Sequence, residues 1–530
     1  MDKSRTWFWL LAALILTVAV VLRFSGLSFG FPYLFHPDEP TAVKRAVLFF
    51  RDGLNPRWFA MPSLYLYLLH FNYRIYGALT GIAHFESDQT VLYLIGRYWS
   101  ALLGSATVVM VFQVGKRLFG RKAGLGAAAL MSALPLHVLH SHYATVDVPV
   151  TFTMTLALLF AARVLERGRL SDYIAAGICA GLSASLKYNG IFAFLPVPAA
   201  GLLRARGWGA APSAPFDRKE WRRLGWAAIA LVLVFFAASP FIIASPAQFL
   251  RDLKLQSGYL ISYGHGPIFI DTKPGALYQL FNVLYYAGGG VFWSLSVAGV
   301  IAALVLRRKE DVLLLSFLIP YYILLSIPTV KFSRFFIPLL PALALLAGRL
   351  LGLSFPRLWM RKALAGLFAA GCLWIFLIGG GYVRMLVRPD ARVEAKEWIE
   401  SNLPRGTRLG MIRTETGLVF LDDPPLAVSH PFLSIERYSR LLPSLAAKPD
   451  YLLATDFDYR DILRLREKYD IIRCQLWSKF LPGEAGYAKV KEFYRPPAIL
   501  GLTFGRPFAP HDMTYNCPRI SLFRRLPENK

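Results

Sequence analysis

The sequence predicts a polytopic α-helical membrane protein with a second, mixed α/β domain at its carboxyl end. Three observations predict it: 55% of the residues are hydrophobic and only 17% charged, about 11 apolar stretches follow one another, and charged sequence begins abruptly after residue 384. We therefore expect a transmembrane domain over residues 1–384 and an extracytoplasmic α/β domain over residues 385–530.

The apolar stretches have roughly the 16–25 residues that a membrane-spanning helix needs. No small-residue cleavage site follows the first one, so we interpret it as a retained span. The predicted spans are residues 7–22, 91–115, 123–139, 145–162, 173–187, 189–203, 224–243, 278–305, 312–329, 335–352 and 363–383.

The gaps between these spans alternate in charge. Every second gap is rich in Lys and Arg, beginning with Lys3 and Arg5, and such gaps face the cytoplasm. An odd number of spans then places the N-terminus inside and the C-terminus outside. Because the basic residues are spread over these gaps, the net charge of +26 does not indicate a nucleic-acid-binding face.

Two regions on the outer side are large. The first outer loop, residues 23–90, contains amphipathic helices, one of them beginning near Pro40, and the aromatic segment Pro62–Tyr76 is expected at the membrane interface. The second region, the tail, contains Cys474 and Cys517, and their spacing leaves open whether they form a disulfide or stay reduced. Its predicted strands are 408–412, 451–454 and 519–523, and its predicted helices are 391–400, 434–446 and 459–468.

Acidic side chains at the outer ends of spans are candidates for catalysis. The segment His36-Pro37-Asp38-Glu39-Pro40 follows the first span, and an adjacent pair of carboxylates can supply a general base and a supporting group. Asp38 can equally serve as an ordinary helix N-cap. Asp147 begins another span and has the same two interpretations; a metal site with His137, His140 and His142 is a third, less specific one.

Cations at the outer membrane face are contrary to the positive-inside rule, so we expect them to have anionic partners. Lys187, which precedes Tyr188, and the pair Lys331 and Arg334 occupy such positions, where a lipid phosphate is the natural partner and snorkelling the alternative. Arg97 lies inside the second span and either binds substrate or pairs with a buried carboxylate.

One histidine in the outer loop 244–277 is a further candidate for binding substrate. The segment Tyr263-Gly264-His265-Gly266 places glycines on both sides of His265, which allows the backbone to approach a ligand closely. A flexible turn explains the same residues equally well.

Taken in order, these motifs resemble those of a known family. His36-Pro-Asp-Glu39, Gly96-Arg97-Tyr-Trp-Ser, Asp147-Val-Pro, Leu186-Lys-Tyr-Asn-Gly190 and Lys331-Phe-Ser-Arg334 are similar to motifs of the bacterial dolichyl-phosphate-mannose protein mannosyltransferase-like family, which includes the aminoarabinose transferases of lipid A. These enzymes belong to the C-type superfamily of membrane glycosyltransferases. The resemblance covers about residues 1–350.

The resemblance implies an inverting glycosyltransferase of the inner membrane that acts on the periplasmic or exterior side. It would move a sugar from a polyprenyl-phosphate carrier to a glycolipid, glycan or protein, without a catalytic metal or cofactor. Asp38, Glu39 and Asp147 would be catalytic, and the expected substrate-binding residues are His36, Arg97, Lys187, Tyr188, His265, Lys331 and Arg334.

One departure from the family puts the aminoarabinose substrate in doubt. Thr41 and Ala60-Met61-Pro62-Ser63 stand where the aminoarabinose transferases carry an arginine and a Glu-Lys-Pro-Pro stretch. The rival interpretations are a transporter or lipid flippase and a sensor. No internal repeat of the kind common in transporters is evident, and a sensor leaves the ordered outer charges without a role.

The charge pattern makes a prediction about topology. Reporter fusions after Arg121, Arg206 and Arg308 should report a cytoplasmic position, and a fusion after Arg392 an extracytoplasmic one, because Lys- and Arg-rich loops stay inside. A cytoplasmic C-terminus would contradict the orientation and with it the outer position of Asp38.

Overall fold

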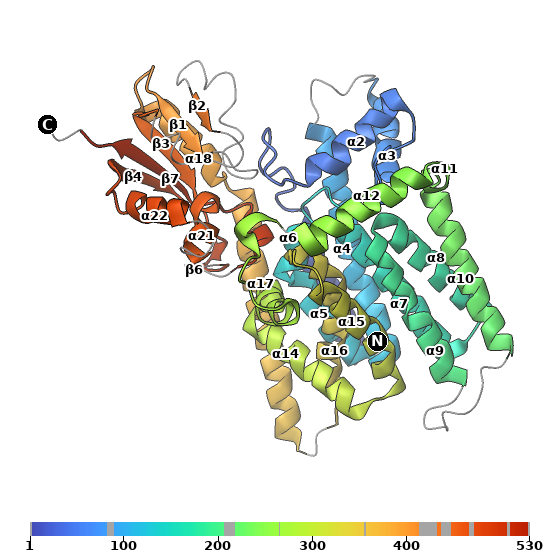
Figure 1. Ribbon diagram of the computed structural model, residues 1–530. Coiled ribbons are helices and arrows are strands. Elements are labelled where there is room, and N and C mark those ends of the chain that lie inside the picture. Colours follow the sequence, from blue (N-terminus) through green and yellow to red (C-terminus); the bar gives the residue numbers. More distant parts are fainter. Residues whose placement is uncertain are drawn as a thin grey trace. The chain divides into compact units, whose positions relative to one another are not determined.

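The computed structural model describes residues 3–81, 90–205, 218–263, 265–354, 357–412, 432–435, 447–465, 471–505 and 509–527. The chain forms two compact units (Figure 1). The first, which is helical, comprises Met1–Leu27, Asp38–Tyr263 and Lys273–Val383. The second, which contains the β-sheets, comprises Ser28–Pro37, Gly264–Thr272 and Arg384–Lys530, so it takes in two short segments far from the tail in sequence.

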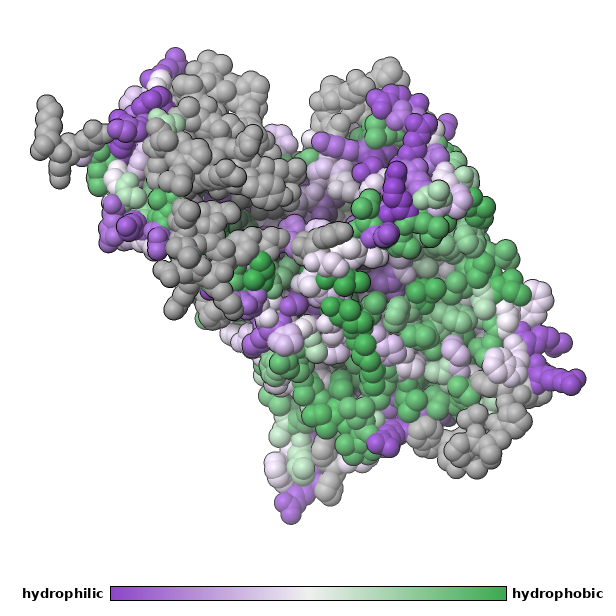
Figure 2. Space-filling model, viewed as in Figure 1, coloured by the Kyte–Doolittle hydropathy of each residue, from purple (hydrophilic) through white to green (hydrophobic). Residues whose placement is uncertain are grey.

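Seven stretches of helix among the described residues have the length and composition to cross a membrane: Thr6–Phe24, Thr90–Phe119, Asp147–Arg167, Arg218–Ala238, Gly275–Leu306, Ser333–Gly352 and Leu358–Asn402. Helices also occupy the other four predicted spans, as α5–α6, α8, η1–α9 and α15, but these fall short of that criterion. A polytopic helical fold is therefore confirmed, while the number 11 and the orientation stay predictions. Figure 2 shows hydrophobic surface along the sides of the helices of this unit and hydrophilic residues near helix ends.

The helical unit contains the following elements. They are α1 (Lys3–Phe24), α2 (Glu39–Asp52), α3 (Leu64–Thr80), α4 (Thr90–Phe119), α5 (Arg121–Ala133), α6 (Pro135–His140), α7 (Asp147–Arg167), α8 (Leu170–Leu186), η1 (Tyr188–Phe194), α9 (Pro196–Ala205), α10 (Arg218–Ala238), α11 (Phe241–Ala244), α12 (Pro246–Gly258), η2 (Tyr259–Tyr263), α13 (Gly275–Tyr278), η4 (Gln279–Val283), α14 (Leu284–Leu306), α15 (Lys309–Ser326), η5 (Ser333–Leu339), α16 (Leu340–Arg349), η6 (Leu350–Gly352) and α17 (Leu358–Val387).

Small residues let the helices of this unit approach one another closely. A Cβ atom added at Gly115 of α4 would come within 2.7 Å of the backbone of Gly124 in α5. One added at Gly177 of α8 would come within 2.1 Å of the carbonyl of Ala227 in α10. Lipid is as apolar as a helix surface, so close van der Waals packing of this kind is a main source of helix association in membranes.

The first outer loop contains the two amphipathic helices that its sequence predicts. α2 has Pro40 in its first turn and ends at Gly53, whose φ of 76° favours glycine. α3 continues four residues beyond the predicted Tyr76 and ends at Gly81 in the left-handed conformation. Both helices bury one face, with Ala42, Val43 and Ala46 on the buried side of α2.

The second unit has a five-stranded sheet of order β2-β1-β3-β7-β4. β1 pairs in parallel with β2 and β3, while β7 runs antiparallel between β3 and β4. The elements are α18 (Ala391–Asn402), β1 (Leu409–Ile412), β2 (Phe432–Ile435), β3 (Tyr451–Thr455), α21 (Asp456–Leu465), α22 (Ile471–Phe480), β4 (Tyr487–Phe493), β7 (Ile520–Arg525), the short strands β5 (Ala498–Ile499) and β6 (Leu502–Thr503), and the turns η3 (Gly266–Ile268) and η9 (His511–Thr514).

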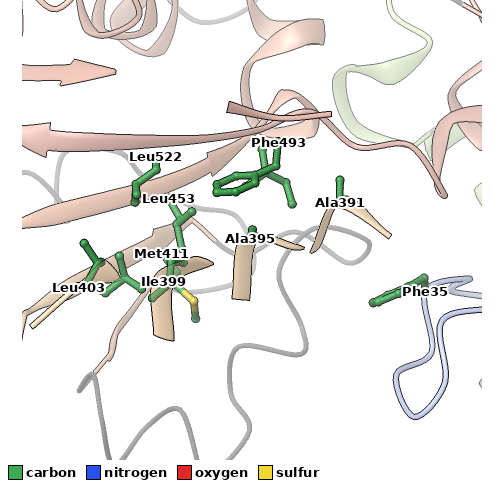
Figure 3. Packing of buried hydrophobic residues seen from close by; sticks show 11 residues of the cluster. Phe35, Ala391, Ala395, Ile399, Leu403, Met411, Leu453, Phe493 and Leu522 are labelled. Carbon is green, nitrogen blue, oxygen red and sulfur yellow. The ribbon is translucent and has the colours of Figure 1, made fainter. Parts of the chain in front are cut away.

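Two hydrophobic clusters hold this unit together. In one, Ala395 and Ile399 of α18 pack with Met411, Leu453 and other residues of the sheet (Figure 3). In the other, Trp477 and Phe480 of α22 pack with residues of α21 and the sheet. The elements therefore have the alternation expected of an α/β unit.

Two details of the tail differ from the sequence-based expectations. The predicted helix 434–446 begins inside strand β2, because Phe432–Ile435 pairs with β1; residues 436–446 lie outside the described residues, as do 466–468 of the predicted helix 459–468. Cys474 and Cys517 are both buried and both free, so the disulfide alternative is wrong for this structure.

The carboxyl of Asp458 makes the second unit sensitive to pH. Its Oδ2 accepts hydrogen bonds from the backbone N and the Oγ1 of Thr455, at 2.7 and 2.9 Å. Burial raises its pKa from 3.8 to about 7. The folded carboxyl thus keeps its proton to higher pH than the unfolded one. Its contribution to stability is full below about pH 3.8 and is lost as the pH rises through about 7.

Comparison with Asp458→Asn tests this pH dependence, because the amide stays neutral at every pH. The free energy of protection of β3 amides from hydrogen exchange, wild type relative to variant, should fall between about pH 4 and pH 7, by up to roughly 1.4 kcal/mol per pH unit, and should level off above pH 7. Glu484→Gln, which changes an exposed carboxyl of the same unit, is the control. Parallel pH profiles for wild type and Asp458→Asn would contradict the raised pKa.

Candidate functional site

A pocket of about 210 Å³ in the helical unit brings together several of the predicted site residues. Its walls come from the start of α2, the loop before α3, the junction of α6 and α7, the junction of α8 and η1, the end of α12 with η2, and the start of η5. Asp38, Asp147, Lys187, Tyr188 and Arg334 all line it. Segments from across the helical unit therefore converge here, as a site for a ligand requires.

Asp38 forms an ion pair with Arg334 across the pocket. Arg334 Nη1 lies 3.1 Å from Asp38 Oδ2, and the two side chains are 14% and 39% exposed. Asp38 does occupy the N-cap position of α2, but its side chain makes no capping hydrogen bond. The geometry thus favours the catalytic interpretation over the N-cap interpretation, since the carboxylate reaches into the pocket.

Asp147 forms a second ion pair, with Lys187. The Lys187 Nζ donates to Asp147 Oδ1 at 2.7 Å, and the lysine side chain is the more exposed partner, at 23% against 6%. The carboxylate sits in the first turn of α7, where the positive end of the helix dipole stabilises it. Both Lys187 and Arg334 therefore contact a carboxylate and an aromatic ring.

The backbone after Lys187 explains the glycine of the Lys-Tyr-Asn-Gly motif. α8 ends at Lys187, whose extended backbone leads into the η1 turn. Gly190 N donates to the Lys187 carbonyl at 2.7 Å, and a Cβ atom at Gly190 would come within 2.2 Å of the Ser183 carbonyl. Only glycine fits this approach, so the motif fixes the turn that points Lys187 at Asp147.

Glu39 and Arg97 form a fully buried pair that does not line the pocket. Arg97 donates to Glu39 through Nε at 2.7 Å and Nη2 at 2.8 Å, and both side chains are 0% exposed. Glu39 also accepts from Ala144 N, and Arg97 donates to the Leu27 carbonyl. The sequence-based roles of Glu39 in catalysis and Arg97 in binding substrate thus do not fit the geometry, which favours the alternative of a structural pair.

A network of hydrogen bonds holds the loop before α3 and helix α12 at the mouth of the pocket. The Asp252 carboxylate of α12 accepts from Phe59 N at 2.9 Å, and the Tyr188 hydroxyl donates to the Phe59 carbonyl at 2.8 Å. Trp58 lines the pocket with its ring 3.9 Å from the guanidinium carbon of Arg45. This cation–π contact with Arg45 holds the indole of Trp58 in place as a flat apolar wall of the pocket.

Three predicted binding residues lie elsewhere. Lys331 Nζ donates to the Lys273 carbonyl at 3.0 Å, and burial lowers the pKa of this lysine. It does not line the pocket, so it does not fit a role on the donor phosphate. His36 belongs to the second unit, where its ring packs on Tyr515, and His265 precedes the η3 turn of the same unit. For both histidines, a role in binding substrate stays a prediction.

The histidines near Asp147 have other partners than a metal. His137 Nδ1 lies 3.1 Å from Arg23 Nη2, a cation that disfavours a second one, and both ring nitrogens of His142 contact backbone carbonyls. Among the residues that the structure describes, no group of three or more His, Cys, Asp and Glu side chains could hold a metal ion.

The sequence did not single out the residues that α12 contributes to the pocket. Gln256, Tyr259 and Leu260 line it, and Asp252 anchors the helix. Ser245-Pro246 marks the start of this helix in the sequence, but only the structure shows that Asp252 is its one buried residue.

The fold is similar to those of solved membrane proteins. It is similar to ArnT from Cupriavidus metallidurans in the apo state, with a TM-score of 0.53 and 16% identity over 98% of both chains, and to ArnT bound to undecaprenyl phosphate, with a TM-score of 0.52 and 15% identity over the same shares. It is also similar to the archaeal oligosaccharyltransferase AglB from Archaeoglobus fulgidus in complex with an inhibitory peptide and a dolichol-phosphate: the TM-score is 0.52, with 12% identity over 98% of this chain and 78% of that one.

Residues 85–243 match the family model of dolichyl-phosphate-mannose-protein mannosyltransferase. The resemblance to the protein mannosyltransferase-like and aminoarabinose transferase-like family is thereby confirmed. No curated protein sequence matches the chain significantly.

The buried pair makes a prediction about stability. Glu39→Ala leaves the Arg97 guanidinium buried without its carboxylate and should lower the free energy of unfolding by about 3–5 kcal/mol. Asp38→Ala, at the neighbouring and more exposed position, should change it by only about 1 kcal/mol or less. Thermal unfolding of both variants in one detergent measures the difference, and equal losses would contradict a structural role for Glu39.

Proposed function

We propose that this protein is an inverting glycosyltransferase that moves a sugar from a polyprenyl-phosphate carrier to an acceptor hydroxyl. One observation carries the proposal: a single pocket holds two carboxylate–cation pairs, Asp38 with Arg334 and Asp147 with Lys187. The reaction needs both charges, a base for the acceptor and cations for the phosphate that leaves. The similarity of fold to ArnT bound to undecaprenyl phosphate supports the choice of donor.

The pocket is suited to the reacting end of such a donor. Its volume, about 210 Å³, is below the roughly 300–1,000 Å³ typical of sites for drug-sized ligands, so it accommodates a sugar ring with its phosphate but no polyprenyl chain. The indole of Trp58 offers a flat surface against which a sugar can stack. The chain of the donor would extend from the pocket into the bilayer.

The two cations would hold the phosphate of the donor. Arg334 pairs with a carboxylate that is 39% exposed, so a phosphate entering the pocket can compete for its guanidinium. Lys187 is the more exposed member of its pair and can contact the phosphate while Asp147 keeps it in place. As the bond between the sugar C1 and the phosphate oxygen breaks, charge grows on that oxygen, and both cations stabilise it.

Asp38 would act as the base. Once the phosphate engages Arg334, the carboxylate of Asp38 would accept the proton of the acceptor hydroxyl. The acceptor oxygen attacks C1 from the face opposite the phosphate and inverts that carbon, while polyprenyl phosphate leaves. Asp147 serves as a positioning residue, since its buried carboxylate holds the Lys187 ammonium.

The remaining details follow from the resemblance. We infer an inner-membrane location with the pocket on the periplasmic or exterior side, and an envelope glycolipid, glycan or protein as acceptor. Incubating the reconstituted protein with polyprenyl-phosphate-linked mannose, glucose and aminoarabinose, together with an envelope extract, tests the proposal. Release of polyprenyl phosphate from one of these donors supports it, whereas movement of an intact donor across the bilayer without cleavage would indicate a flippase instead.

Removing the base should slow chemistry and spare binding. Asp38→Asn should reduce release of polyprenyl phosphate by about 10²–10⁴-fold, because the amide cannot accept the acceptor proton. Affinity for undecaprenyl phosphate, measured by titration in nanodiscs, should be retained. Asp52→Asn, at the other end of α2 and outside the pocket, is the matched control. Full turnover in Asp38→Asn would remove the catalytic role.

Removing a pocket cation should instead weaken binding. Arg334→Gln should lower the affinity for undecaprenyl phosphate by roughly 10-fold or more, since a charge-assisted contact with the phosphate is lost. Lys44→Gln removes an exposed cation of α2 that does not line the pocket and should leave the affinity unchanged. An equal loss in both variants would mean that only the general surface charge attracts the lipid phosphate.

A further inference from the structure

A second hollow in the helical unit has a different character. It is a groove of about 660 Å³ whose walls come from α1, α5, the residues around η6, and the first half of α17. Most of its lining is aliphatic or aromatic, with Leu11 and Ile15 of α1 facing Phe368 of α17. The residues along its floor are small, among them Gly126, Ala129 and Ala365.

Three cations lie at one end of this groove. Lys122 belongs to the first turn of α5, and Arg361 and Lys362 to the first turn of α17. All three side chains are exposed, and none forms an ion pair with another residue that the structure describes. No acidic residue occurs among the described residues that line the groove.

The groove lies far from the pocket of Asp38 and Asp147. α5 and α6 lead from Lys122 to His140, close in sequence to the pocket residue Thr145, and such a helical path is about 30 Å long. The cations therefore mark the opposite end of these helices, which the charge pattern predicts to face the cytoplasm. The reacting end of the donor and the cationic end of the groove are separate.

The length of the groove matches one leaflet of a bilayer. Along α17 the lining residues run from Leu358 to Cys372, and the part from the cation Arg361 to Cys372 rises about 17 Å over eleven residue steps of 1.5 Å. Half of a hydrocarbon core of ~30 Å is ~15 Å. A lipid with its phosphate at the cations would thus place an acyl chain along the apolar part as far as the middle of the membrane.

We propose that this groove is a binding site for an anionic glycerophospholipid of the leaflet that contacts Lys122, Arg361 and Lys362. The three cations select the anionic headgroup, and the apolar walls hold an acyl chain. A soluble phosphate would leave the apolar part unfilled, and a zwitterionic lipid would gain less than an anionic one from the three cations. The lipid would bind between α1, α5 and α17 and stabilise the position of α17, the helix that precedes the tail in the sequence.

The test uses the full-length protein, stripped of lipid and offered equal amounts of phosphatidylglycerol and phosphatidylcholine. Native mass spectrometry should find phosphatidylglycerol retained in preference. In Lys122→Gln/Arg361→Gln/Lys362→Gln the preference should fall by on the order of 100-fold, since each cation near an anionic lipid contributes roughly fivefold. Ala365→Phe/Ala369→Phe keeps the cations but fills the groove, and should lose both lipids.

A matched control removes as many cations from another helix end on the same predicted side. Arg218→Gln/Lys219→Gln/Arg222→Gln changes three exposed residues at the start of α10, outside the groove, and should keep the preference. Equal loss in this control, or equal retention of the two lipids by the wild type, would overturn the proposal. So would displacement of phosphatidylglycerol by inorganic phosphate or by undecaprenyl phosphate, or occupation of the groove by a second copy of the chain.

Discussion

The buried ion pair between Glu39 and Arg97 is the constraint on which the pocket depends. Through it, the first turn of α2 is tied to the first third of α4, to the segment after α1 at Leu27, and to the α6–α7 junction at Ala144. Two desolvated charges hold together only when nearly every donor and acceptor has a partner, and here four hydrogen bonds meet on two side chains. Asp38 is the next residue, so its position follows from that of Glu39.

In this arrangement the two adjacent acids, Asp38 and Glu39, have different roles. Glu39 cannot leave its partners without leaving a buried charge unpaired, whereas Asp38, whose Oδ2 lies 3.1 Å from Arg334 Nη1, remains 39% exposed. A base must be able to change its partner and its proton during a reaction, and an anchor must not. Adjacent side chains on a helix point in different directions, which lets one segment of sequence provide both functions.

Much of the fold was predictable because its causes are local. Apolar length and the distribution of Lys and Arg located the helices, and Pro40 and Gly53 marked the ends of α2. Strand β2 was not predictable in the same way, because its pairing with β1 joins residues that no local pattern connects. The free cysteines show the same limit, since spacing alone does not decide whether Cys474 and Cys517 meet.

The candidate site was predictable as a set of residues more than as a set of partnerships. Sequence motifs pointed to Asp38, Asp147, Lys187 and Arg334, and all four line one pocket. The same reasoning could not tell that Arg97 pairs with Glu39 or that Lys331 is held by a backbone carbonyl, since both depend on distant segments. The role of α12 was not predicted for a related reason: it rests on contacts with a distant segment, such as those from Asp252 to Phe59 and from Gln248 to Arg57.

Burial separates the ion pairs of the helical unit into two kinds. Glu39–Arg97 and Asp311–Arg349 have side chains that are at most 2% exposed, and they fasten helices to one another. Asp38–Arg334 and Asp147–Lys187 each keep one partner more than 20% exposed, and both line the pocket. A phosphate can compete only for a cation that it can reach, so only pairs of the second kind can exchange a carboxylate for a ligand. Arg163–Asp172 and Arg117–Glu166 are also partly exposed but do not line the pocket, so exposure marks an exchangeable pair only where that pair also lines a pocket.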